Sequence, residues 1–172
     1  MADQNSKELV ITRVFDAPRE LVWKAWTDPQ QVKRWWGPKD FTAPHISIDF
    51  REGGKYLYCM HGVGAPGTPA QDFWSAGVFK EIVPEERIVV SDYFSDKDGN
   101  KTSPAQMGLS EDFPAESEVT ITFDKEGDKT RLTITYPLPQ SGATREAMLN
   151  SGMEQGWNQS LDKLANVVKA GK

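Results

Sequence analysis

Apolar and polar side chains alternate strictly in two segments of the C-terminal half of the chain. In VTITF, residues 119–123, three apolar side chains fall on one face and two threonines on the other, and LTITY, residues 132–136, repeats the pattern. The link DKEGDK, residues 124–129, is polar and contains a glycine, which suits a hairpin loop. The pattern therefore predicts two neighbouring strands, each with one buried face.

Five further segments predict strands, because each is rich in β-branched or aromatic residues and ends at turn residues. They are ELVITRVF (8–15), APHISIDF (43–50), GGKYLYCMHG (53–62), DFWSAGVFKEIVP (72–84) and ERIVVSDYF (86–94).

A spacing of three to four residues between apolar positions predicts two short helices after the first strand. The segment RELVWKAW, residues 19–26, carries a one-sided apolar stripe. Thr27 or Asp28 can then cap a second short helix, which we expect to run to Trp36, where a Gly-Pro pair stops it.

The last segment, from about Thr144 to Lys169, has the same helical spacing over a greater length. Its apolar stripe consists of Leu149, Met153, Trp157, Leu161, Leu164 and Val168. We expect one long amphipathic helix that covers the strands, since a helix rises 1.5 Å per residue and this one can cross a whole sheet. Gly152 and Gly156 weaken the helix locally and permit a bend or a close approach to the sheet.

This order of elements predicts an α+β fold of the helix-grip type. A curved antiparallel sheet, with two short helices near the N-terminus, wraps around a long C-terminal helix. The length of 172 residues suits a single domain over residues 1–172, and we expect residues 1–7 to form a flexible N-terminal tail. The arrangement resembles the START-like, or birch-pollen-allergen (SRPBCC), superfamily.

Four stretches of local sequence resemble one family within that superfamily. They are FDAPRELVWKAWTDPQQVKRWWGP, FREGGKYLYCM, GVFKEIVPEERIVVS and MEQGWNQSLDKLANVV. These stretches are similar to the AHSA-like proteins, the family related to the activator of the heat-shock-protein-90 ATPase. The resemblance covers nearly the whole chain and is weakest in the loops at 62–71 and 96–116.

The resemblance implies an internal cavity between the sheet and the long helix. More distant relatives in the superfamily bind lipids, hormones or polyketides, and a few cyclise them. The family takes its name from a domain of a co-chaperone, so a heat-shock chaperone is a second kind of partner that the resemblance implies.

Charge and composition narrow the possible partners and compartment. The net charge is −5 and the pI is near 5.1, and we find no cluster of Lys and Arg, so we expect neither nucleic acid nor an anionic membrane surface as a partner. The N-terminus lacks a basic start and an apolar run, so we expect a cytoplasmic protein without a signal peptide. Cys59 is the only cysteine, which excludes an intrachain disulfide.

Aromatic and sulfur-containing side chains form the candidate ligand-binding set. Tyr56, Tyr58 and Met60 share one strand face, which we assign to the interior because the opposite face carries charge. The whole set is Trp36, Phe41, Tyr56, Tyr58, Met60, Phe73, Met153 and Trp157. For each member alone an ordinary core position is the better interpretation, and the ligand-binding hypothesis depends on the convergence of the whole set.

Trp35 and Trp36 cannot both face one core, because adjacent helical residues point about 100° apart. We expect one indole to pack under the second helix. The other, with Phe41, either closes one end of the cavity or covers the sheet edge.

Signals for catalysis or for a cofactor are weak. His45 and His61 fall in no pattern that resembles a catalytic triad. Cys59 and His61 share a strand face, but one thiol without a carboxylate beside it in the sequence does not predict a metal site. No glycine-rich phosphate loop occurs. We therefore expect no catalytic residue, no metal and no cofactor.

Three functions fit these observations. The first is a non-enzymatic cytoplasmic protein that encloses a small hydrophobic or aromatic ligand. The second is a protein that docks on a heat-shock chaperone through its surface, and the third is a cyclase or hydrolase of the same fold. The long polar segment 96–116 also carries Met107, Leu109 and Phe113, which predicts a mobile flap.

Overall fold

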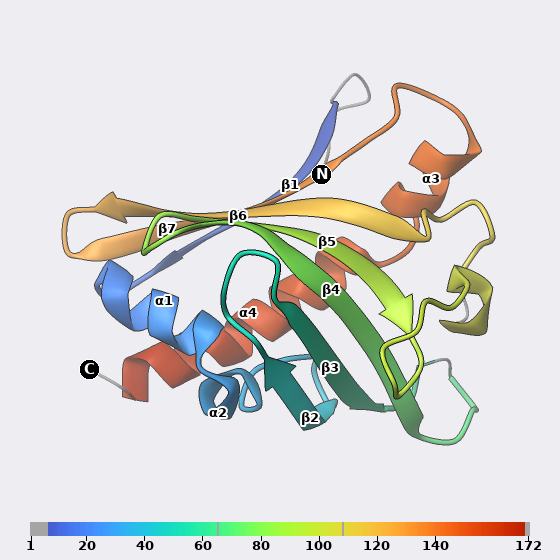
Figure 1. Cartoon of the computed structure of the whole chain (residues 1–172), viewed down its shortest axis with the longest axis horizontal. Coiled ribbons are helices and arrows are strands. Elements are labelled where there is room, and N and C mark those ends of the chain that lie inside the picture. Colours follow the sequence, from blue (N-terminus) through green and yellow to red (C-terminus); the bar gives the residue numbers. More distant parts are fainter. Residues whose placement is uncertain (1–6, 65, 108, 171–172) are drawn as a thin grey trace.

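A seven-stranded antiparallel sheet forms the body of the protein in a computed structural model, which describes residues 7–64, 66–107 and 109–170. The spatial order of the strands is β1-β7-β6-β5-β4-β3-β2. Their bounds are β1 Glu8–Phe15, β2 Thr42–Ile48, β3 Lys55–Gly62, β4 Gln71–Val83, β5 Arg87–Ser95, β6 Glu116–Glu126 and β7 Lys129–Pro137. The sheet curves over helix α4 (Met153–Ala170), which runs beneath it (Figure 1). The predicted α+β helix-grip fold is confirmed.

The strict alternation that predicted β6 and β7 corresponds to burial. Val119, Ile121 and Phe123 are each less than 5% exposed, whereas the threonines between them are half-buried. The two strands pair in antiparallel register, with Ile121 opposite Ile134.

The predicted tail over residues 1–7 lies outside the described residues except for Lys7, whose carbonyl accepts a hydrogen bond from Leu138 N at 2.8 Å.

The N-terminal helices are α1 (Arg19–Thr27) and α2 (Pro29–Val32). The Asp28 side chain caps α2 by accepting a hydrogen bond from Gln30 N at 3.0 Å. The helix ends at Val32, and the prediction that it runs to Trp36 is wrong. The chain instead turns over the next residues, and Trp35 is fixed by tertiary contact, since its Nε1 donates to Ala25 O at 2.9 Å.

The C-terminal segment is two helices, so the prediction of one helix over 144–169 is also wrong. Helix α3 (Ala143–Leu149) ends before α4 begins at Met153. Between them Gly152 has a φ of +82°, a left-handed conformation that breaks an α-helix. Ser151 Oγ accepts a hydrogen bond from Met153 N at 3.2 Å and so caps the new helix. Leu149 is consequently off the apolar stripe and is exposed.

A short 3-10 helix, η1 (Pro104–Met107), lies within the long connection between β5 and β6. Among the described residues, no helix has the length and apolar composition needed to span a membrane.

Candidate ligand-binding cavity

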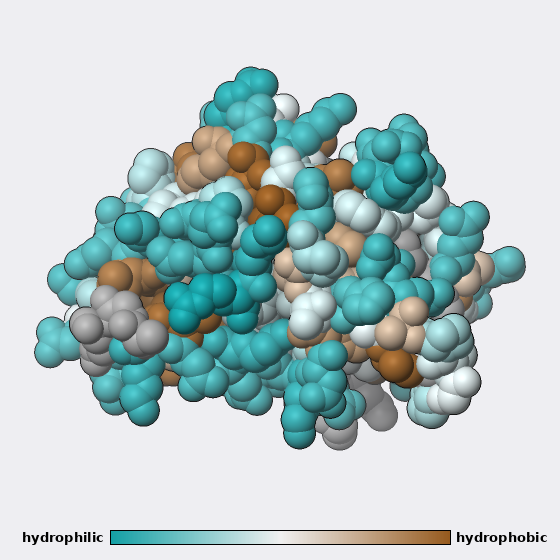
Figure 2. Space-filling model, turned by 90° about the horizontal axis from the view of Figure 1, so that it is seen from below, coloured by the Kyte–Doolittle hydropathy of each residue, from teal (hydrophilic) through white to brown (hydrophobic). Residues whose placement is uncertain are grey.

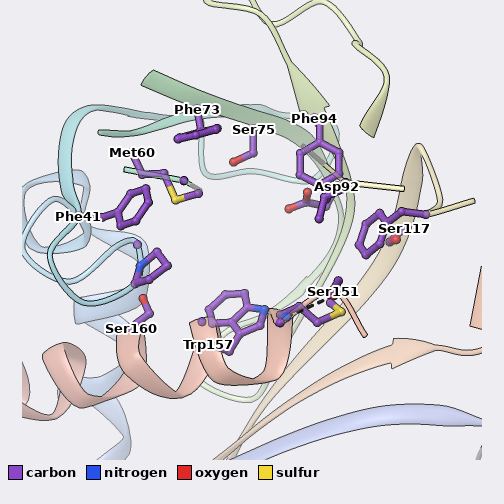
Figure 3. Close-up of a pocket in the computed structure, with 18 of the residues that line it drawn as sticks. Phe41, Met60, Phe73, Ser75, Asp92, Phe94, Ser117, Ser151, Trp157 and Ser160 are labelled. Atoms are coloured by element: carbon purple, nitrogen blue, oxygen red, sulfur yellow. Dashed lines mark hydrogen bonds between the residues drawn. The ribbon is translucent and has the colours of Figure 1, made fainter. Parts of the chain in front are cut away.

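A cavity of about 500 Å³ lies between the concave face of the sheet and the N-terminal half of α4. Strands β3 to β7 supply part of its wall, and the segments around residues 36–41 and 109–115 close two of its sides. In Figure 3, side chains from the strands and from α4 point at one another across this space. Its wall is mainly aromatic and aliphatic, which is typical of small-molecule sites.

The structure separates the two adjacent tryptophans. Trp35 is only 1% exposed and packs against Trp26, with ring centroids 4.8 Å apart. Trp36 lines the cavity and contacts Tyr58 at 4.6 Å and Trp157 at 5.5 Å between centroids. One indole is thus a core residue, and the other is part of the cavity wall.

Phe41 and Phe73 form one end of the cavity, with centroids 6.1 Å apart and Met60 beside them (Figure 3). Glycines make room for these rings. A Cβ at Gly62 would lie 2.8 Å from the Phe41 ring, and one at Gly64 would lie 2.6 Å from Phe73. Larger residues at either position would displace the rings that shape this end.

Helix α4 presents Met153, Gly156 and Trp157 to the cavity. Trp157 is held in place because its Nε1 donates a hydrogen bond to the Tyr136 hydroxyl at 2.8 Å. Its ring also stacks on Trp26, with centroids 5.9 Å apart and an interplanar angle of 11°. The indole is therefore a rigid part of the wall.

Tyr56 and Tyr58 are the members of the predicted set that do not line the cavity directly. Their side chains point to the interior, as expected, but they are buried at 5% and 6% exposure and pack behind the wall. Tyr58 supports Trp36, and Tyr56 packs against Phe79 with centroids 5.3 Å apart. Trp36 therefore stands between Tyr58 and the cavity, and the Tyr56 hydroxyl is directed to Asp92. Trp36, Phe41, Met60, Phe73, Met153 and Trp157 all line the cavity.

Asp92 on β5 is the main residue of the cavity that the sequence reasoning missed. It is partly buried, lines the cavity and accepts a hydrogen bond from the Tyr56 hydroxyl at 2.8 Å. Burial raises the pKa of Asp92 to about 7, although the Tyr56 hydrogen bond opposes this shift. The same burial, with the nearby carboxyl, raises the pKa of Tyr56 well above its usual value.

A glycine on the intervening strand makes this contact possible. Tyr56, Gly77 and Asp92 lie in one row across β3, β4 and β5. A Cβ at Gly77 would lie 2.4 Å from the Tyr56 hydroxyl oxygen, so only glycine lets the tyrosine reach across β4. Asp92 shares a face of β5 with Val90 and Phe94, because the three residues are two apart, and this spacing in the sequence was the available signal that its side chain faces inward.

Other lining residues also escaped the sequence reasoning. Phe94 and Phe113 pack together with centroids 5.7 Å apart. Phe113 comes from the segment 96–116, so this part of the predicted flap packs into the wall of the cavity. The remaining missed positions include small or hydroxyl side chains, Ser75, Ser117 and Tyr136.

The outer face of the sheet places a carboxylate beside the histidine that the sequence left isolated. His61 Nδ1 lies 2.8 Å from Asp72 Oδ1 of the neighbouring strand. Burial and the nearby Asp72 raise the pKa of the Cys59 thiol to about 11, so the thiol is protonated and a poor metal ligand. The described residues contain no group of three or more His, Cys, Asp or Glu side chains arranged to bind a metal.

Solved structures share the fold over nearly their whole length. A protein from Arthrobacter aurescens is 25% identical with a TM-score of 0.75, and the match covers 99% of this chain and 90% of that one. A protein from Mycobacterium smegmatis is 25% identical with a TM-score of 0.72, covering 98% and 91%. The AHSA1-like protein from Aeromonas hydrophila is 23% identical with a TM-score of 0.61, covering 95% and 93%.

A comparison with curated proteins finds no match. The family model described as "Activator of Hsp90 ATPase homolog 1-like protein" matches residues 16–169, which include strands β2 to β7, helices α1 to α3, helix α4 up to Lys169 and the cavity wall. The chain therefore belongs to the Activator of Hsp90 ATPase homolog 1-like family, within the SRPBCC superfamily.

Proposed function

We propose that the protein binds a small hydrophobic or aromatic molecule in the cavity between the sheet and α4. The observation that carries this proposal is the cavity itself, whose volume of about 500 Å³ falls within the range of small-molecule sites. Trp36, Trp157 and Phe73 offer faces and edges of rings on different sides, and such surfaces favour a flat or aromatic ligand.

Rigid side chains around the cavity support a preformed site. Trp36 and Trp157 contact each other edge to face at 88°, and Trp157 is hydrogen-bonded to Tyr136. A preformed wall lowers the ordering cost of binding. The face in Figure 2 favours ligand binding over docking on a protein partner. It is largely hydrophilic, and its apolar side chains form separate small patches.

The test is a titration with N-phenyl-1-naphthylamine, an uncharged probe whose fluorescence rises in apolar surroundings. We expect saturable binding to the whole chain. Ser75 lines the cavity, so Ser75→Phe fills it and should weaken probe binding about tenfold or more, because the ring excludes the probe. Ser47→Phe, at an exposed position of β2 in the same sheet, is the matched control and should leave binding unchanged.

Probe binding that is equal in both variants would contradict the proposal, as would absence of saturable binding to the unmodified chain. Native mass spectrometry of the purified protein adds a second readout, in which a co-purified small molecule would support the proposal. A heat-shock ATPase captured by the protein, with no probe bound, would instead favour the docking function that the family name suggests.

A further inference from the structure

A single carboxyl group interrupts the apolar wall of the cavity. Among the described lining residues Asp92 is the only one with an ionisable carboxyl, and none is a lysine, arginine or histidine. In Figure 3 its oxygens point toward the open middle of the cavity. The acid thus lies in a site where the described wall supplies no cation to balance its charge.

The Tyr56 hydroxyl satisfies only part of the hydrogen-bonding capacity of this carboxyl. A carboxylate can accept about four hydrogen bonds, and Tyr56 donates one. A carboxylate in an apolar site is costly unless a positive charge or several donors compensate it. The structure leaves the cavity side of Asp92 available for such a group.

Aromatic rings around the same space favour a positive charge. Trp36, Trp157, Phe94 and Phe113 line the cavity together with Asp92. The faces of such rings attract organic cations, and tryptophan does so most strongly. The carboxyl group and the aromatic rings therefore both favour a ligand that carries an organic cation.

We propose that Asp92 is the specificity-determining residue of the cavity and that the ligand is a hydrophobic or aromatic amine whose ammonium group pairs with its carboxylate. This inference rests on the proposed function and names its ligand class. Tyr56 acts as a positioning residue, because its hydroxyl orients the carboxyl from behind, across Gly77.

The ionisation of Asp92 makes the pairing depend on pH. Among the described residues, Tyr56 and Tyr58 on β3 and Tyr136 on β7 are buried near it, and burial raises the pKa of all three, so they stay neutral near pH 7. Tyr93, the next residue on β5, also lines the cavity. Since the pKa of Asp92 is about 7, roughly a tenth of the free protein carries its carboxylate at pH 6 and roughly nine-tenths at pH 8. Affinity for an amine should therefore rise about tenfold between these pH values.

The experiment measures displacement of N-phenyl-1-naphthylamine from the whole chain by three probes of similar shape. They are 1-naphthylmethylamine, 1-naphthylmethanol and 1-naphthylacetate. At pH 8 we expect the amine to bind about tenfold more tightly than the alcohol, and the acetate most weakly. At pH 6 most of the advantage of the amine should disappear.

Three variants test whether the Asp92 carboxyl causes the preference for the amine. Asp92→Asn keeps the shape and the Tyr56 contact, and it should bind all three probes without favouring the amine. Tyr56→Phe should keep a preference for the amine, because the carboxylate remains. Asp72→Asn removes an exposed carboxylate on the outer face and should change nothing.

The outcomes separate this inference from the proposed function. If the cavity binds N-phenyl-1-naphthylamine but amine and alcohol displace it equally at both pH values, the amine specificity is overturned and the binding function stands. If the acetate displaces N-phenyl-1-naphthylamine more effectively than the amine at both pH values, the cavity prefers an anion, which also overturns the inference. If neither N-phenyl-1-naphthylamine nor directly titrated amine binds, both proposals are overturned.

Discussion

The two halves of helix α4 face the same sheet with different results. The C-terminal half packs solidly, with Leu164 fully buried and Val168 only 4% exposed. The N-terminal half presents Met153, Gly156 and Trp157 to an open cavity. The apolar stripe is continuous along the helix, so the helix alone does not determine where the cavity lies.

The difference comes from the facing strands. On β7, Tyr136 meets Trp157 beside the cavity, and further along the same strand face Ile134 and Leu132 are large, apolar and fully buried. Toward the cavity, β4, β5 and β6 supply Ser75, Asp92 and Ser117. Large side chains under the C-terminal half of α4 fix the distance between the helix and the sheet. The short and polar side chains near the N-terminal half therefore leave space that the helix cannot fill. In this protein the strands, and not the helix, therefore determine where the cavity lies.

A substitution in the solid half of α4 should change the stability most. Leu164→Ala should lower the free energy of unfolding by about 3–5 kcal/mol, because it removes a fully buried side chain from a packed region. Met153→Ala, on the cavity half, should cost about 1 kcal/mol or less, since Met153 already borders empty space. Urea unfolding of both variants measures the difference. Equal losses would show that the two halves pack alike.

The next effect concerns the charge in the cavity. Asp92 loses its proton near pH 7 in the folded protein, against an ordinary value of 3.8. The folded state therefore binds more protons between these values, and stability falls as pH rises through that window and is level above it. Asp92→Asn should remove this loss and stabilise the protein at pH 8 by at most about 4 kcal/mol, since one pKa unit corresponds to about 1.4 kcal/mol.

Urea midpoints of Asp92→Asn and the unmodified protein should converge as the pH falls toward 4. Asp72→Asn is the matched control, because Asp72 is half exposed on the outer face of the sheet. A stability difference that does not change between pH 4 and pH 8 would contradict the assignment of the proton to Asp92.

Two glycines provide a comparison of intermediate size. Gly77→Ala should destabilise by about 1–3 kcal/mol, because the new Cβ meets the Tyr56 hydroxyl and the Ser91 carbonyl oxygen. Gly156→Ala on α4 should be neutral or stabilise by up to about 1 kcal/mol, since its Cβ meets only Pro38 at 3.7 Å and alanine favours the helix. Thermal unfolding of both variants measures this. A tolerated Gly77→Ala would show that Tyr56 does not need the gap.

The smallest effect is dynamic. We expect amide hydrogens in the described parts of the connection, residues 96–107 and 109–115, to exchange faster than those of β6, because these residues form only a short 3-10 helix and one isolated bridge, Ser95 to Lys101. Hydrogen exchange followed by mass spectrometry compares the two regions. Protection equal to that of β6 would mean that Phe113 anchors the whole connection.

Local sequence alone determined the strands and the family. The alternation in β6 and β7 survives in the structure because one face of each strand is buried, and a shift by one residue would expose every apolar side chain. Most of the candidate site followed from the same rule. Phe73 and Met60 line the cavity because they project from the inner face of the sheet, and Trp157 lies on the stripe of α4.

Only the tertiary structure decided where the helices break and what the cavity contains. The sequence alone allowed Gly152 to lie inside one continuous helix. In the structure it adopts a left-handed conformation, which separates α3 from α4. In the sequence Asp92 is an ordinary polar residue of a strand. Its hydrogen bond to Tyr56 depends on Gly77, which the sheet register places between them. Local sequence sets which way a side chain points from its strand, whereas its neighbours, its burial and its pKa depend on strands that are distant in sequence and meet only in the folded sheet.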